Sequence, residues 1–202
     1  MNALIAADSS RLDKESKSLE LVSIELNSID AATWKDYEYL LKLTLQNNNL
    51  TTLSRHYFNN LSNLNTLLIK KNRQVTYLDA DVFAEMPSLT LLDLTENALV
   101  SLSASAFSGL TLLTRLILNK NSLSTLSAGV FDPLQNICVI SMTDNSFKNS
   151  SESSITAALS SMTNSKLVTV YLGANPIWSS STLTSPAICG TNKNCVIDFI
   201  LN

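Results

Sequence analysis

Side chains that commonly perform catalysis are sparse in this sequence, and their spacing assembles no recognisable catalytic site. His56 is the single histidine, and no serine or cysteine triad can be placed around it. Asp93 and Glu96 lie close together, but neighbouring lysines and a shallow surface disfavour a general acid–base pair. Four glycines in the whole chain leave little room for a phosphate-binding loop. We therefore expect no catalytic residue and no cofactor.

Cysteines and carboxylates bear on redox chemistry and metal binding. Cys189 and Cys195 lie close together near the end of the chain, and Cys138 is distant from both. We predict a Cys189–Cys195 disulfide and an unpaired thiol at Cys138, and the alternative is that all three thiols stay reduced. No second pair of cysteines or nearby histidine completes a zinc signature. Too few oxygen ligands converge on Asp93 or Asp144 for calcium, so we expect no metal site.

The composition narrows the classes of partner. Of 202 residues, 45% are apolar and only 15% are charged, which favours a large buried core over disorder. A net charge of −3 argues against a nucleic-acid partner, because binding to phosphates needs a basic excess. The chain has no run of 18 apolar residues, so we expect no membrane span within it.

A repeated spacing of leucines organises most of the chain. An apolar residue is followed by two more at the third and fifth positions after it, and then by an asparagine. The pattern opens at Leu19, Leu40, Leu64, Leu89, Leu113, Ile137 and Leu167. The asparagines are Asn27, Asn48, Asn72, Asn97, Asn121, Asn145 and Asn175. A pattern that recurs at intervals of 21 to 30 residues predicts a solenoid, an architecture that mainly presents a surface for binding.

Each position of the repeat has a physical reason. Alternation in Leu116-Ile117-Leu118 predicts a half-buried strand, and successive strands should stack in parallel. The asparagine follows the strand, where its amide can satisfy buried backbone groups of the turn and of the neighbouring coil. Six residues before every later start except Leu167 lies an aromatic residue, and we expect this row to pack on the convex side. The row consists of Trp34, Phe58, Phe83, Phe107 and Phe131.

Two irregularities interrupt the period. One extra residue lies between Asn72 and Val75, so we expect a bulge at Arg73 or Gln74. The sixth unit is 30 residues long, and its residues 154–162 have the apolar spacing of a short helix.

The complete repeat unit, which combines the leucines, the asparagine and the aromatic residue, resembles the leucine-rich repeat family, in the 24-residue class typical of its extracellular members. Its defining residues in one unit are Leu113, Leu116, Leu118, Asn121, Leu123, Leu126, Phe131 and Leu134. The resemblance implies an α/β solenoid, a right-handed horseshoe with a parallel concave sheet and an irregular or short-helical convex side. We expect residues 1–18 to form an N-terminal flank, residues 19–178 about seven repeats and residues 179–202 a C-terminal cap.

The resemblance also implies that the concave face of the sheet holds the ligand. We expect a protein or peptide partner, with Leu91, Asp93, Arg115 and Ile117 near the centre of the contact. Apolar residues in this face either form an interface or are covered by flanking threonines and lysines. The candidate ligand-binding residues are Leu21, Lys42, Leu68, Leu91, Asp93, Arg115, Ile117, Val139 and Tyr171.

A row of alternating charge, Lys71, Glu96, Lys120 and Asp144, occupies one position of successive repeats. These side chains either form ion pairs between neighbouring strands or remain solvated and contribute little to stability.

Two rival functions and two locations remain open. The chain is either a recognition module or a structural segment of a larger scaffold or adhesin that self-associates, for example as a homodimer. A hydrolase is the least favoured reading. The repeat class resembles surface receptors and secreted proteins, which implies an extracellular or cell-surface location. The missing cysteine caps and the unpaired Cys138 weigh against this location, and the alternative is the cytoplasm.

Overall fold

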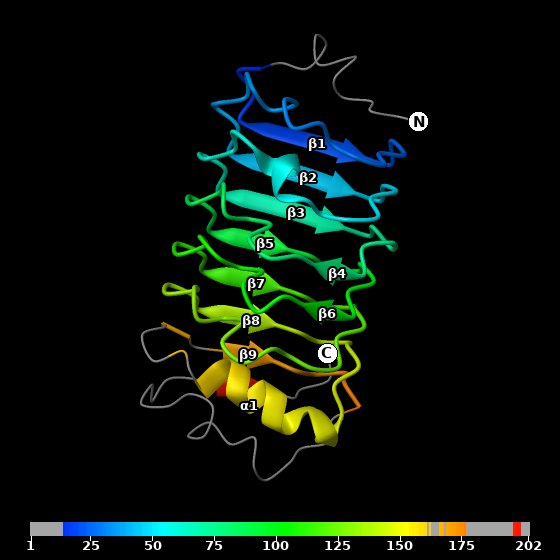
Figure 1. Ribbon diagram of the computed structural model, residues 1–202, viewed down its shortest axis with the longest axis vertical. Coiled ribbons are helices and arrows are strands. Elements are labelled where there is room, and N and C mark those ends of the chain that lie inside the picture. Colours follow the sequence, from blue (N-terminus) through cyan, green and yellow to red (C-terminus); the bar gives the residue numbers. More distant parts are fainter. Residues whose placement is uncertain (1–13, 161, 163–165, 168, 177–195, 199–202) are drawn as a thin grey trace.

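Eight parallel strands, stacked in the order in which they occur in the chain, form the frame of the structure (Figure 1). The computed structural model describes residues 14–160, 162, 166–167, 169–176 and 196–198. Because each strand pairs only with its sequence neighbours in the sheet, the fold is the predicted solenoid. The strands are β1 (Ser18–Val22), β2 (Lys42–Gln46), β3 (Thr66–Lys70), β5 (Leu91–Asp93), β7 (Arg115–Ile117), β8 (Val139–Ser141), β9 (Thr169–Tyr171) and β10 (Val196–Asp198).

The remaining elements are short and lie in the segments that connect these strands. They are β4 (Tyr77–Leu78) and β6 (Ser101–Leu102), which pair in a second sheet, the 3-10 helices η2 (Arg55–Phe58) and η3 (Asn149–Ser151), and the helix α1 (Glu152–Ser160). Helix α1 confirms the helix expected in the long sixth unit, and it buries Ile155, Ala158 and Leu159. The described part of the chain contains no helix with the length and apolar character that a membrane crossing requires.

The predicted bulge after Asn72 is confirmed as a turn in which both Arg73 and Gln74 are exposed. The extra residue projects into solvent, so Val75 returns to the core and remains fully buried.

A row of asparagines, all buried except the half-buried Asn175, joins each coil to the one before it, as predicted. The Nδ2 of Asn121 donates to the carbonyl of Leu118 in its own coil and to the carbonyl of Leu94 in the preceding coil, at 3.0 Å each. Its Oδ1 accepts a hydrogen bond from the N–H of Leu99, also in the preceding coil. Donation to the preceding coil recurs at Asn48, Asn72, Asn97, Asn145 and Asn175. We call these six residues the asparagine ladder.

The register of the first repeat differs from the prediction by three residues. In the structure Ser18 pairs with Lys42 and Leu21 pairs with Leu45, so the unit begins near Ser16 and not at Leu19. The predicted start at Leu19 is therefore wrong, and the first coil has the same length as the second.

The prediction was wrong because Val22, Ile24 and Asn27 have the spacing of the two later apolar residues and the asparagine of the repeat, but three residues too late in the chain. Asn27 is exposed and takes no part in the asparagine ladder, whose position in this coil is occupied by Ile24. A ladder amide serves the preceding coil, and the described residues contain no coil before β1.

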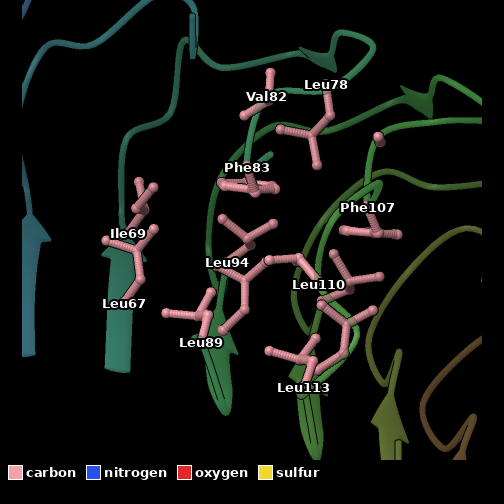
Figure 2. Close-up of a cluster of buried hydrophobic side chains, with 14 of the residues drawn as sticks. Leu67, Ile69, Leu78, Val82, Phe83, Leu89, Leu94, Phe107, Leu110 and Leu113 are labelled. Atoms are coloured by element: carbon pink, nitrogen blue, oxygen red, sulfur yellow. The ribbon is translucent and has the colours of Figure 1, made fainter. Parts of the chain in front are cut away.

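The predicted aromatic row is confirmed, and it fills the convex side of the core. Phe107 stacks between Phe83, with ring centroids 6.4 Å apart, and Phe131, at 6.0 Å. All three rings are fully buried, and Leu94 and Leu110 lie between the sheet and the rings of Phe83 and Phe107 (Figure 2). At the start of the row, Trp34 donates from its indole Nε1 to the carbonyl of Tyr57 at 2.5 Å. The core is therefore continuous from one coil to the next.

Segments at both ends of the repeats are joined to them. Before β1, the Lys14 ammonium contacts the Asp36 carboxylate at 2.5 Å. The hydrogen bond between these groups lowers the pKa of Asp36 and raises that of Lys14. At the other end, β10 lies in the segment expected to form a cap, and it pairs in parallel with β9.

Removal of one ladder amide should destabilise the protein strongly. Replacement Asn121→Ala leaves the Leu99 N–H buried without its side-chain partner and removes one of the two amide donors to the Leu94 carbonyl, and we expect a loss of about 2–3 kcal/mol. Chemical denaturation followed by circular dichroism measures this loss. The matched control is Asn63→Ala, because that amide also donates to the preceding coil, at the Glu38 carbonyl, but is exposed. Equal losses in the two variants would contradict the structural role of the buried row.

Candidate binding surface on the concave face

The outward-facing residues of β2 to β9 form one continuous surface, which we call the concave face. One row across the strands joins Leu91, Arg115 and Val139, and a second joins Leu68, Asp93, Ile117 and Tyr171. Lys42 extends the first row onto β2. All of the predicted ligand-binding residues except Leu21 therefore lie together on this face.

Leu21 is a correction to the predicted set. It was expected to face outwards, but it is only 6% exposed and belongs to the hydrophobic core. The three-residue shift of the first coil explains the error, because the shift turns Leu21 to the same side as Leu45. The residue of that coil that faces outwards nearby is Val22, which is 39% exposed.

The apolar residues of the concave face are half-buried. Leu68, Leu91, Ile117, Val139 and Tyr171 all have intermediate exposure, so flanking side chains cover them in part. The large apolar side chains that are more exposed lie mainly elsewhere, as at Tyr77, Val100 and Leu112. The face is thus a rigid surface with recessed apolar patches and a polar frame, which suits specific anchors better than non-specific adhesion.

Asp93 is occupied by contacts within the protein. Its Oδ2 lies 2.6 Å from the Lys70 ammonium on the neighbouring strand. Its Oδ1 accepts hydrogen bonds from the N–H of Thr95 at 3.0 Å and from the Thr95 hydroxyl at 2.5 Å. With its side chain only 7% exposed, Asp93 organises the face from within. This arrangement leaves Arg115, which is exposed, as the charged group nearest the predicted centre of the contact.

The four residues of the row of alternating charge form no ion pairs with one another in the part of the chain that the structure describes. Lys71, Glu96, Lys120 and Asp144 all have left-handed backbone, with φ between 54° and 57°. The N–H of each donates to a carbonyl of the next coil, so the backbone sets their spacing without help from side-chain charges. The solvated alternative is therefore the one observed.

A hollow of about 350 Å³ opens where β7, β8 and β9 leave the sheet. The sequence analysis missed it, although the signal was present: Gly173 and Ala174 occupy two positions that hold longer side chains in the coils before them. The residues that line the hollow are Asn119, Lys120, Ser141, Thr143, Asp144, Tyr171, Gly173 and Ala174.

Residues with potential for chemistry are dispersed. His56 is exposed on η2, away from the concave face, and Cys138 is a half-buried free thiol. Cys189 and Cys195 lie outside the described residues. Within the described ranges, no three metal-binding side chains come together.

Comparison with known proteins identifies the repeat and the fold. The model of the family described as Leucine rich repeat matches residues 38–99, 62–122 and 87–147, which together span more than half of the chain. A search of curated proteins gives no match.

Two similar solved structures come from Drosophila. A chain in the structure of the Toll–Spatzle complex, described as a molecular hub in development and innate immunity, has a TM-score of 0.60 and 26% identity over 73% of this chain and 18% of that chain. A chain in the glycosylated form of the complex has a TM-score of 0.67 and 23% identity, and the match covers 80% of this chain and 21% of that one. The chain thus spans about a fifth of the length of the solved chains that it matches.

Loss of the Lys70 ammonium should show how much this ion pair with the buried Asp93 carboxylate contributes to the stability of the protein. We expect Lys70→Met to destabilise the protein by about 1–2 kcal/mol, because it leaves a buried carboxylate with only Thr95 as a donor. Urea unfolding at pH 7 measures the change. Lys42→Met is the matched control, since its pair with Glu20 is exposed and should contribute less than about 0.5 kcal/mol. A larger loss in the control would show that burial of Asp93 is not what matters.

Proposed function

We propose that this chain, which belongs to the leucine-rich repeat family, is a non-enzymatic module that binds a protein or peptide partner on its concave face. The observation that carries the proposal is the concave face itself. Six adjacent strands, β2, β3, β5, β7, β8 and β9, present one uninterrupted parallel surface. At about 4.8 Å between strands, this surface is wide enough for an ordinary protein interface.

Rigidity supports this function. The anchors Leu91 and Ile117 lie on hydrogen-bonded strands, so binding would order few side chains and lose little conformational entropy. The ion pair between Lys70 on β3 and Asp93 on β5 holds these two side chains in one arrangement next to the anchors. The similar solved chains come from a complex between two proteins, which is in keeping with a protein ligand.

Replacement of the two central apolar anchors tests the proposal. Peptides selected from a displayed random library on the native protein serve as probes. The double variant Leu91→Glu, Ile117→Glu should weaken their binding at least tenfold, because each change places a charge in the recessed apolar patch. Leu112→Glu, an exposed position outside the face, is the matched control and should bind normally. Native-like circular dichroism with unchanged binding in the double variant would refute a concave-face site.

We further propose an extracellular or cell-surface location, as part of a receptor ectodomain or a secreted protein. The resemblance to a chain from the Toll–Spatzle structure supports this location. A Cys189–Cys195 disulfide belongs to the same proposal, because structural disulfides persist in oxidising compartments.

The disulfide can be tested by mass. Alkylation of the unfolded protein without reductant should label one thiol, Cys138, and alkylation after reduction should label three. The same experiment on Cys195→Ser should label two thiols without reductant. Three labels on the unreduced native protein, purified from an oxidising compartment, would exclude the bond and weaken the extracellular proposal.

One observation favours the structural alternative, in which the chain self-associates. Tyr77, in β4, is 43% exposed, and Val100, directly before β6, is 51% exposed, and the Val100 N–H donates to the Thr76 carbonyl. These apolar side chains lie away from the concave face. Sedimentation of the native protein separates the two functions, because a stable dimer that is lost in Tyr77→Ser would favour assembly.

A further inference from the structure

The hollow on the concave face results from missing side chains in one coil. Gly173 and Ala174 follow β9, and the equivalent residues of the preceding coil are Thr143 and Asp144. The backbone of the two coils is alike, since Ala174 has a φ of 56° and Asp144 one of 57°. The N–H of Asp144 donates to the Gly173 carbonyl at 2.9 Å, so the coils remain in contact beneath the gap. The surface is therefore recessed without any break in the fold.

The lining of the hollow is ordered and offers unused polar groups. Asn119 accepts hydrogen bonds at Oδ1 from the Ser141 hydroxyl, at 2.7 Å, and from the Thr143 N–H, at 2.9 Å. This fixes the amide, and its Nδ2 remains available as a donor because no described residue accepts from it. One wall is the half-buried side chain of Tyr171.

Opposite charges flank the hollow without neutralising each other. Lys120 and Asp144 both line it, both are exposed, and neither forms an ion pair with a described residue. They occupy equivalent positions of neighbouring coils and share the same left-handed backbone, yet no ion pair joins them. A partner with one acidic and one basic group in the matching order would satisfy both charges.

We propose that this hollow is the anchor subsite of the concave face and that it receives an aromatic side chain of a protein or peptide, flanked by one acidic and one basic residue. The inference rests on the proposed function. A volume of about 350 Å³ is at the small end of binding pockets, which suits one large side chain. An aromatic ring can pack against Tyr171 while a polar tip, such as an indole N–H or a phenol, reaches the fixed groups of Asn119 and Thr143.

The test fills the hollow without disturbing the coil. In Ala174→Lys the new side chain occupies the gap, and the backbone accepts it because Lys71 and Lys120 have the same left-handed conformation at equivalent positions. Ala104→Lys introduces the same charge at an exposed turn after β6 and is the matched control. Tyr171→Ala removes the aromatic wall, whereas Tyr171→Phe retains the ring. The probes are again peptides selected from a displayed random library on the native protein.

The expected result is a shared motif, an aromatic residue with an acidic residue on one side and a basic residue on the other. Affinity should fall at least tenfold in Ala174→Lys and Tyr171→Ala, and it should stay within twofold of native in Ala104→Lys and Tyr171→Phe. Exchange of the acidic and basic residues in a selected peptide should also weaken binding, because each charge then faces its like.

Other outcomes overturn the inference in distinguishable ways. Peptides that bind Ala174→Lys normally but fail on the double variant Leu91→Glu, Ile117→Glu would refute the anchor subsite and leave the concave-face function intact. Peptides blocked by Ala174→Lys that share no aromatic residue would refute the proposed occupant. Peptides that bind every variant equally, or a library that yields no binder, would refute both the subsite and the proposed function.

Discussion

The structure depends on the hydrogen bonds by which a buried asparagine of one coil satisfies the backbone of the coil before it. The turn that leaves each strand places carbonyl and N–H groups in the interior, where water cannot reach them. Unsatisfied buried groups of this kind are costly, and one amide side chain can serve several of them at once. Asn97 does so by donating to Ile69 and Leu94 and accepting from Asn72. The repeat of leucines fills the core, but the asparagine ladder makes the tight turns possible.

This constraint also shapes the binding surface. Because the ladder and the strand pairing hold every coil in one register, outward side chains come to lie in straight rows. Residues more than twenty positions apart, such as Leu91 and Arg115, become neighbours on adjacent strands. Variation at outward positions other than the Lys70–Asp93 pair leaves the core and the ladder intact. A repeat protein can therefore acquire a specific surface without a change in its core.

Charge on the concave face divides into two kinds. Lys70 and Asp93 neutralise each other across neighbouring strands, and Thr95 completes the group, so these residues stabilise the face from within. Lys120 and Asp144 lie farther along their coils, where the backbone turns away, and they remain solvated. The first kind makes the surface rigid, and the second kind is available to a partner. Position within the coil, and not residue type, decides between the two roles.

The sequence by itself determined the solenoid, the direction of the sheet, the aromatic row and the helix of the sixth unit, because each follows from a local period of apolar residues. It also placed the candidate residues from Lys42 to Tyr171 on one face. It failed at the first coil, where Val22, Ile24 and Asn27 imitate the repeat and only pairing with β2 reveals the register of Leu21. Tertiary structure alone decided that Asp93 is engaged by Lys70, and that Gly173 and Ala174 open a hollow that Lys120 and Asp144 also line. These features depend on the distance between side chains of different coils, which a one-dimensional spacing does not contain.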